Sequence, residues 1–210
     1  MGYLINDKIL EAASNISAAT MHEAAGKIGY LPSEIKPIAD GMKICGRAFP
    51  VQGPSGCNLW LHRAIAKATP GDVLVVNVGS DPDYGYWGDI MGTGAIARGI
   101  NGLVINGCVR DKVELIEMGF PVFSMGLSIR GTSKNFEGSG SLAEPILMGG
   151  VDINHGDLII GDNDGLVAIP ADQAESSIEK SIERENKEEA TKEKLRNGET
   201  TMEIYGWPEK

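Results

Sequence analysis

The sequence predicts an α/β fold built on a mainly parallel sheet, with a charged helix at its C-terminal end. Short apolar runs alternate with amphipathic segments of about 12 residues, the pattern of repeated strand–helix–strand units. The composition then changes, and more than half of residues 171–196 are charged. We therefore expect an α/β domain over residues 1–170 and a helical extension over residues 171–210.

The first half of the chain is expected to form the first helices and strands of this domain. Helical spacing of apolar residues marks the helices, and apolar runs that end at Gly or Pro mark the strands. Asn15 and Thr20 are candidate helix caps. The expected helices cover residues 7–15, 19–28, 58–68 and 87–100. The expected strands cover residues 42–51 and 73–78.

The second half continues the alternation and then changes to short strands. The expected elements are a strand at 102–107, a helix at 112–118 and a strand at 121–124. Residues 125–142 are polar and glycine-rich, which predicts a loop. Strand-like pieces follow at 143–147 and 150–154. Residues 156–170 predict two strands joined at Asp164–Gly165, a hairpin turn signal.

The C-terminal extension predicts one long helix that projects and packs against a partner. Its apolar stripe is thin and consists of Ala174, Ile178 and Ile182. Glutamates stand four residues before lysines along it, the order that favours a helix. Tyr205 and Trp207 near its end are candidates for docking it.

The composition excludes several classes of partner. The formal net charge of −10 argues against a nucleic acid ligand, because phosphate binding needs a basic surface. No apolar run approaches the ~20 residues that span a bilayer, and the first residues lack the pattern of a signal peptide. Three widely spaced cysteines favour reduced thiols in a cytoplasmic protein and disfavour a zinc site. A small anionic substrate stays possible where an arginine or a metal supplies local positive charge.

Arg110 and Asp111 follow a buried strand and precede a helix, and they allow two interpretations. In the first, Asp111 is a helix cap whose charge suits the positive helix end. In the second, the pair forms part of a site, since ligands of α/β sheets collect at the carboxyl ends of parallel strands. There an aspartate could hold a divalent cation and an arginine an anionic oxygen. The spacing alone does not choose between them.

The segment Trp87-Gly88-Asp89-Ile90 opens the helix expected at 87–100. Its unpaired backbone amides could bind an anion, and a glycine would let a carboxylate approach the backbone closely. The alternative is that Asp89 only improves the helix start and Gly88 is a loop glycine.

Other polar residues receive structural interpretations. Asp81 and Asp83 favour a turn over a metal site, and residues 161–165 favour a hairpin turn over a calcium loop. His62 lies on the apolar side of its helix and is expected in the core or at an interface. Lys134, in the polar loop, is expected to be solvated. No glycine motif for nucleotides occurs.

Taken together, four segments resemble one known family. These are PGDVLVV, WGDIMGTGAIARGINGLVINGCVRD, FPVF and GDLIIGDNDGLVAIP, in this order and at compatible spacing over residues 35–170. They resemble RraA-like proteins, and among them the class II pyruvate aldolases that act on 4-hydroxy-4-methyl-2-oxoglutarate and 4-carboxy-4-hydroxy-2-oxoadipate. The resemblance implies a β/α/β sandwich akin to phosphohistidine swivelling domains. It also implies retro-aldol cleavage of a 4-hydroxy-2-oxo acid to pyruvate, with oxaloacetate decarboxylation as a side activity.

The resemblance also implies roles for the two segments left open above. Asp111 would anchor Mg²⁺ or Mn²⁺, largely through waters, and Arg110 would contact the pyruvyl carbonyl oxygen. Asp89 would help to orient the catalytic water. The backbone amides that would bind the pyruvyl carboxylate belong to Gly88, Asp89, Ile90 and Met91.

Assembly is the last implication of the resemblance. The family forms trimers or hexamers in which a glutamate from a neighbour's C-terminal extension approaches the metal, and Glu188, then Glu189, match it best. The alternative within the same family is a non-catalytic, protein-binding regulator of a ribonuclease. That regulator is shorter and lacks the charged extension, so the extension and the Arg110–Asp111 pair together favour the enzyme.

Overall fold

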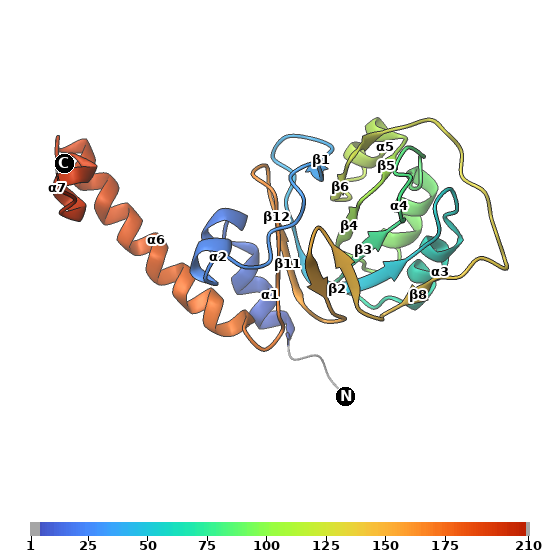
Figure 1. Cartoon of the computed structure of the whole chain (residues 1–210), viewed down its shortest axis with the longest axis horizontal. Coiled ribbons are helices and arrows are strands. Elements are labelled where there is room, and N and C mark those ends of the chain that lie inside the picture. The colour runs from blue at the N-terminus through green and yellow to red at the C-terminus, as the bar shows by residue number, and fades with distance from the viewer. Residues whose placement is uncertain (1–4, 209–210) are drawn as a thin grey trace.

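The computed structural model describes residues 5–208 and shows a sheet with layers on both faces and a long helix that leaves the body (Figure 1). The helices are α1 (Asp7–Ser14), α2 (Ala18–Ala24), α3 (Leu59–Lys67), α4 (Asp89–Ile96), α5 (Lys112–Glu117), α6 (Ala174–Arg196) and α7 (Thr201–Tyr205). The strands of the large sheet are β1 (Lys36–Pro37), β2 (Ile44–Gln52), β3 (Asp72–Asn77), β4 (Gly102–Ile105), β6 (Val122–Ser124), β8 (Ser141–Leu142), β11 (Leu158–Gly161) and β12 (Leu166–Ile169). The others are β5 (Cys108–Val109), β7 (Gly126–Leu127), β9 (Ile146–Met148) and β10 (Val151–Ile153).

The centre of the sheet is parallel and its edges are antiparallel. Its order is β1-β6-β4-β3-β2-β11-β12, and β2, β3, β4 and β6 run parallel to one another. β11 and β12 form the expected hairpin, because the connection of residues 162–165 is too short for a parallel crossover. The expected parallel layer is therefore confirmed for the strands that alternate with helices, and the sheet as a whole is mixed.

The alternation of side chains along β3 builds two cores. Val73 and Val75 pack in a cluster with residues of β9 and β10, whereas Leu74 and Val76 pack in a cluster with residues of α3, α4 and α5. Successive strand residues point to opposite faces, so a strand that is apolar throughout requires cover on both. The β9–β10 hairpin, the large sheet and the helices α3 to α5 form three layers with the sheet in the middle, which confirms the expected α/β fold class (Figure 1).

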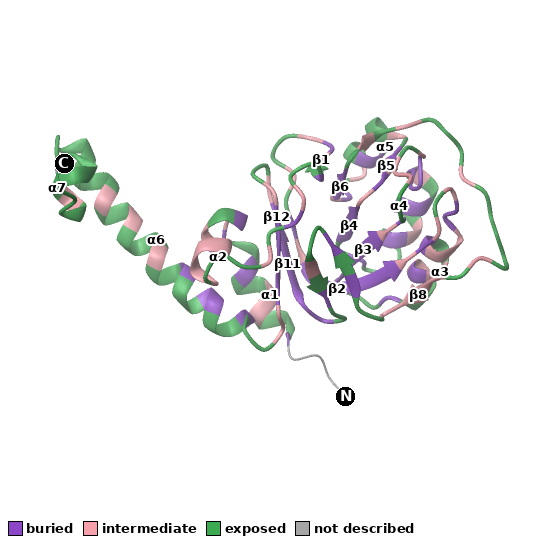
Figure 2. Cartoon of the chain, in the orientation of Figure 1, coloured by how far each residue is buried: buried purple, intermediate pink, exposed green. Residues whose placement is uncertain are grey.

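A third core holds the N-terminal helices and the beginning of the extension against β11 and β12. It joins Met21 of α2, Ile160 of β11, Ile169 of β12 and Ile178 of α6. Ala174 and Ile178 are buried, but Ile182 is 48% exposed, so the apolar stripe is used for only about two turns. Beyond that point α6 is largely exposed and projects from the body (Figure 2).

The end of the extension does not pack on the body of its own chain. Tyr205 and Trp207 stack on each other, with ring centroids 4.8 Å apart, and both are about half exposed. Thr200 and Glu203 form a capping box that starts α7. The expectation that the extension packs on a neighbouring subunit stays a prediction, and its first turns pack on α1 and α2 of the same chain.

Several local expectations are corrected. Helix α2 ends at Ala24, and its cap is Ser17, whose side chain accepts a hydrogen bond from the amide of Thr20. The segment expected as a loop over 125–142 contains β7 and β8, which pair with β5 and β2. Two-residue strands are too short to show alternation, so only their tertiary partners reveal them. Among residues 5–208, no helix is both long enough and apolar enough to cross a membrane.

Candidate active site

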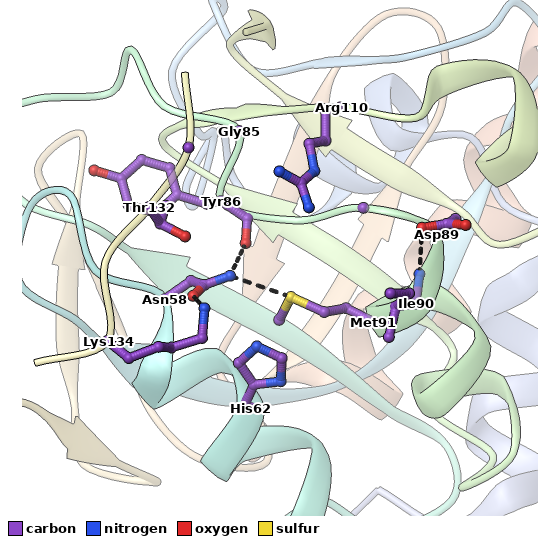
Figure 3. Close-up of a pocket in the computed structure, with 12 residues that line it drawn as sticks. Asn58, His62, Gly85, Tyr86, Asp89, Ile90, Met91, Arg110, Thr132 and Lys134 are labelled. Carbon is purple, nitrogen blue, oxygen red and sulfur yellow. Dashed lines mark hydrogen bonds between the residues drawn. The ribbon is translucent and has the colours of Figure 1, made fainter. Parts of the chain in front are cut away.

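A cavity of about 330 Å³ lies where the loops after the parallel strands meet the beginnings of α3 and α4. The loop after β3 supplies Gly85 and Tyr86, and the segment after β5 supplies Arg110 (Figure 3). Residues 131–134 cross the cavity from the other side. The residues expected to bind substrate, which are Gly88, Asp89, Ile90, Met91 and Arg110, all line it.

The backbone at Asp111 explains why two consecutive charged side chains share one corner of the molecule. Arg110 is held as a strand continuation, since its amide donates to the carbonyl of Trp87 at 2.9 Å. Asp111 then adopts the left-handed conformation, with φ +57°, and the alternation of a strand is broken. The Arg110 Nε and Asp111 Oδ2 atoms are 3.5 Å apart, and both side chains stay partly exposed.

Asp111 occupies the N-cap position of α5, yet its side chain does not cap that helix. Its Oδ2 atom instead accepts a hydrogen bond, at 3.2 Å, from the amide of Asp89 at the beginning of α4. The capping interpretation is therefore wrong for this carboxylate. It contacts a helix that is neighbouring in space, where the unpaired amides favour negative charge.

Gly88 is the residue that permits this contact. A Cβ atom at position 88 would lie 2.2 Å from Asp111 Oδ2 and 3.3 Å from Arg110 Cγ, so a side chain there would displace the pair. The sequence suggested that Gly88 lets a carboxylate approach the backbone, and the carboxylate in this structure is that of Asp111. The glycine within α4 has a different role, because a Cβ at Gly92 would meet Leu115 of α5 at 2.8 Å.

The amides at the beginning of α4 are partly engaged by acidic side chains. The Asp89 amide is bonded to Asp111, and the Ile90 amide donates to Asp89 Oδ1 at 2.7 Å. Both acceptors are carboxylate oxygens, which is the chemistry expected of a ligand here. An incoming carboxylate would replace Asp89 Oδ1 at the amide of Ile90.

The opposite side of the cavity is built by Asn58, Lys134 and His62 (Figure 3). Lys134 is exposed, as expected for a solvated lysine, and its ammonium also donates to Asn58 Oδ1. His62 is exposed to the cavity and does not lie in the core. Burial of the imidazole, followed by the charge of Lys134, lowers the pKa of His62 from its ordinary value. The helical spacing predicted which side of α3 carries His62. It did not predict that a cavity lies beside the beginning of that helix.

The loop between β3 and α4 is tied down by its own polar groups. Asp81 Oδ1 accepts a hydrogen bond from the amide of Asp83 at 3.3 Å, which confirms the turn interpretation. Asp81 also pairs with Arg130, whose guanidinium lies 3.7 Å from the centroid of the Tyr84 ring. The buried Tyr86 ring donates its hydroxyl to the Asp81 carbonyl at 2.6 Å. These contacts join the two loops that bound the cavity.

Two of the three thiols have raised pKa values. Cys45, Cys57 and Cys108 are free, and burial raises the pKa of the Cys108 thiol, with Asp83 raising it further. Burial likewise raises the pKa of Cys45 to about 12. A thiolate is the reactive form, so the raised pKa values of Cys45 and Cys108 disfavour either thiol as a nucleophile.

The described residues of one chain do not assemble a multi-ligand metal site. No group of three His, Cys, Asp or Glu side chains is gathered among residues 5–208. Glu188 pairs with Arg184 at 2.7 Å on α6, which lies beside β11 and β12 and away from α4 (Figure 1). Within one chain the structure therefore brings Arg110, Asp111 and residues 88–91 together and leaves Glu188 apart.

The chain is similar to known proteins both in sequence and in structure. A family model described as RraA-like, Aldolase/RraA, matches residues 7–168. The chain is 33% identical over 190 residues, 90% of each chain, to a protein of Halalkalibacterium halodurans named "Putative 4-hydroxy-4-methyl-2-oxoglutarate aldolase". A solved structure of an uncharacterized protein from Pseudomonas syringae pv. tomato is 28% identical, with a TM-score of 0.83 over 93% of this chain and 92% of that one. Another, from Streptomyces coelicolor, is 26% identical with a TM-score of 0.78, covers 90% and 98% of the two chains, and is described as an unusual member of the RNase ES inhibitor RraA protein family.

Proposed function

Because the chain belongs to the RraA-like family, we propose that it is a divalent-metal-dependent lyase that cleaves a 4-hydroxy-2-oxo acid and releases pyruvate. The substrate would be of the 4-hydroxy-4-methyl-2-oxoglutarate or 4-carboxy-4-hydroxy-2-oxoadipate type, and oxaloacetate would be decarboxylated as a side reaction. One observation carries the proposal. The left-handed backbone at Asp111 places its carboxylate and the Arg110 guanidinium at one corner beside the first amides of α4.

The residues of this corner fit a hard divalent cation. Asp111 Oδ1 has no hydrogen-bond partner among the described residues, and it is a hard oxygen donor. Mg²⁺ commonly keeps several waters and takes only one or two carboxylates, so a single aspartate from this chain is a sufficient anchor. The bound cation would supply Lewis-acid polarisation of the 2-oxo acid.

The remaining chemistry is assigned to side chains and amides of this chain. The terminal nitrogens of Arg110 have no partner among the described residues, and they would donate to the keto oxygen most strongly as it becomes an enolate. The amides of Ile90 and Met91 would hold the carboxylate of the substrate at the positive end of α4.

Asp89 would orient the water that takes the proton from the C4 hydroxyl. As that proton leaves, the C3–C4 bond breaks and its electron pair moves to the keto oxygen held by Arg110. Protonation at C3 then gives pyruvate, and the C4 carbonyl product leaves. The local cations Arg110 and Lys134 would allow an anion to bind in a protein of net charge −10.

Pyruvate release tests the proposal, with and without Mg²⁺ or Mn²⁺, from 4-hydroxy-4-methyl-2-oxoglutarate and from oxaloacetate. We expect metal-dependent turnover that falls about 10²- to 10³-fold in Asp111→Asn and in Arg110→Lys. The matched controls are Asp81→Asn and Arg130→Lys, which change a pair of similar exposure outside the substrate contacts. Their turnover should stay within about threefold of wild type. Equal losses in both pairs would contradict the assignment.

The assembly is proposed as a trimer or hexamer in which Glu188 of a neighbour approaches the metal. Support comes from α6, whose outer half projects from the body and carries Glu188 away from the cavity of its own chain (Figure 1). We expect Glu188→Gln to lower turnover about 10- to 100-fold. Co-expression of Asp111→Asn chains with Glu188→Gln chains should restore turnover, because mixed oligomers then contain complete sites. Absence of restoration would contradict the assignment of Glu188 to the site of a neighbouring chain.

A second candidate is a non-catalytic protein that binds a ribonuclease. The solved relative from Streptomyces coelicolor, described as belonging to an RNase inhibitor family, favours it. Absence of metal-dependent turnover on both substrates, together with measurable binding to a ribonuclease, would support this candidate over the lyase.

A further inference from the structure

The buried side chain of Tyr86 lies where two loops of the candidate active site meet. Its hydroxyl accepts a hydrogen bond from the amide of Gly56 at 2.8 Å and donates one to the carbonyl of Asp81 at 2.6 Å. Gly56 belongs to the loop before α3, and Asp81 belongs to the loop after β3. One accepted bond and one donated bond hold the hydroxyl from both sides, so the far end of the Tyr86 ring is fixed between the two loops.

The backbone of Tyr86 connects the same network to the segment that carries Arg110. The Tyr86 amide donates to the carbonyl of Cys108 at 3.0 Å, and the Tyr86 carbonyl accepts a bond from Asn58 Nδ2 at 2.9 Å (Figure 3). The carbonyl of the next residue, Trp87, accepts the amide of Arg110 at 2.9 Å. The two segments are therefore paired at two consecutive places, and the hydroxyl of Tyr86 anchors one of them.

A glycine in the second segment makes room for the ring. A Cβ atom at Gly107 would lie 2.9 Å from Tyr86 Cδ2 and 3.0 Å from Val78 Cγ2, which is closer than side chains pack. The backbone of Gly107 does not have a positive φ, so its conformation alone does not require glycine. The ring of Tyr86 thus packs directly on the backbone of the segment that leads to Arg110 and Asp111.

The relative position of these two segments decides whether the Asp111 carboxylate reaches the amide of Asp89. That contact spans 3.2 Å, near the upper limit of a hydrogen bond, so a displacement of about 0.5 Å would break it. Asp89 begins α4 and Asp111 precedes α5, so neither residue belongs to a strand of the large sheet. The bond between Tyr86 and Cys108 lies just before both residues and holds the two segments together.

We propose that Tyr86 is a positioning residue, whose hydroxyl fixes the segment carrying Gly88 and Asp89 against the segment carrying Arg110 and Asp111. The hydroxyl acts through the backbone of these segments and not on the substrate. For its effect on turnover, the inference rests on the proposed function. Its effect on the position of the two segments can be measured without any substrate.

Tyr86→Phe tests the inference because it keeps the ring and removes only the hydroxyl. The matched control is Ser55→Ala. The Ser55 hydroxyl also donates to a backbone carbonyl, that of Val78 at 2.9 Å, and accepts a backbone amide, that of Asp81 at 3.2 Å. Both variants therefore remove one hydroxyl and two bonds between the same two loops, but Ser55 has no bond to the segment that carries Arg110.

The amide proton shift of Asp89, measured by NMR, reports its bond to Asp111. We expect Tyr86→Phe to move this shift toward its value in Asp111→Ala, and Ser55→Ala to leave it unchanged. Gly107→Ala displaces the ring from its other side and should move the shift in the same direction. It decides the question if Tyr86→Phe does not fold. An unchanged shift in both Tyr86→Phe and Gly107→Ala, or an equal change in Ser55→Ala, would overturn the inference.

Turnover provides the second arm. We expect Tyr86→Phe to lower kcat about 10- to 100-fold and to change KM less than kcat, because a small misalignment affects the transition state more than binding. Ser55→Ala should keep both constants within about threefold of wild type. Equal losses of kcat in the two variants would overturn the inference. Absence of turnover by wild type would count against the proposed function alone, because the amide shift still decides the role of Tyr86.

Discussion

Two arginine–aspartate pairs in this protein look alike and differ in what surrounds them. Arg110–Asp111 and Arg130–Asp81 are separated by 3.5 and 3.2 Å, and all four side chains are partly exposed. Arg130 lies over the Tyr84 ring, and Asp81 accepts a second bond from the amide two residues later. The Arg130–Asp81 pair thus uses its groups to join two loops.

The Arg110–Asp111 pair retains polar atoms that make no contact within the described residues. The terminal nitrogens of Arg110 and the Oδ1 atom of Asp111 have no partner among the described residues, although both side chains border the cavity or the beginning of α4. Its geometry depends on a left-handed aspartate and on the missing side chain of Gly88. The exposure and pairing of the side chains are similar in the two pairs, so they do not identify which pair belongs to a site. The left-handed backbone at Asp111 does distinguish them, because a protein maintains such a conformation at an energetic cost.

The largest expected effect on turnover comes from Gly88→Ala, which tests whether the position of the Asp111 carboxylate distinguishes the two pairs. The added Cβ would stand 2.2 Å from Asp111 Oδ2, so the carboxylate must move by about 1 Å, and we expect turnover to fall at least about 100-fold. The matched control is Gly94→Ala in the same helix, where the nearest atom would be Ile65 Cγ2 at 3.8 Å. That variant should retain turnover and gain stability toward urea. Full turnover in Gly88→Ala would show that the position of Asp111 is not needed.

The left-handed backbone at Asp111 should affect the free energy of unfolding even in variants that have lost turnover. Asp111→Ala and Asp111→Gly both remove the carboxylate, but only glycine adopts φ +57° without strain. We expect the glycine variant to have a free energy of unfolding about 1 kcal/mol higher than the alanine variant. Urea denaturation followed by circular dichroism measures the difference. At Asp81, where φ is not positive, alanine should be no worse than glycine.

Removal of the Arg130 contacts between the two loops should have a smaller effect on stability. Arg130→Ala deletes the ion pair with Asp81 and the stacking on Tyr84, both of them exposed, so the expected loss is about 0.5–1 kcal/mol in the free energy of unfolding. The metal dependence of turnover should not change. A loss of turnover as large as that of Arg110→Lys would mean that the two pairs are not functionally distinct.

The smallest expected effect is a change of pKa at His62. The protonated imidazole is disfavoured by burial and by Lys134, so the unfolded chain binds the proton more readily, and stability falls as the pH drops from 6.5 through the lowered pKa. Lys134→Met should raise the pKa of His62 and reduce this fall, with Arg110 and Asp89 the other charged groups lining the cavity. NMR titration of the imidazole measures the pKa. An unchanged value would mean that the lysine charge does not act on His62.

Much of this protein was determined by its sequence alone. The alternation of apolar strands and amphipathic helices predicted the α/β class, and Asp164–Gly165 marked the hairpin that forms β11 and β12. Composition located the charged extension that forms α6. These features depend on a residue's own burial and on its immediate neighbours, which periodicity reports directly. The segments 87–91 and 110–111 were also found from the sequence, but only the assembled resemblance favoured a site over a cap.

Tertiary structure alone decided what those side chains contact. The Asp111 carboxylate contacts α4 and not its own helix, and Lys134 bonds to Asn58, which lies 76 residues earlier. The two-residue strands β5 and β7 likewise exist only as a pair. Each of these contacts depends on where a distant segment of the chain is packed. A local sequence pattern carries no information about where a distant segment packs. The sequence therefore indicated candidate residues of the site but not their geometry.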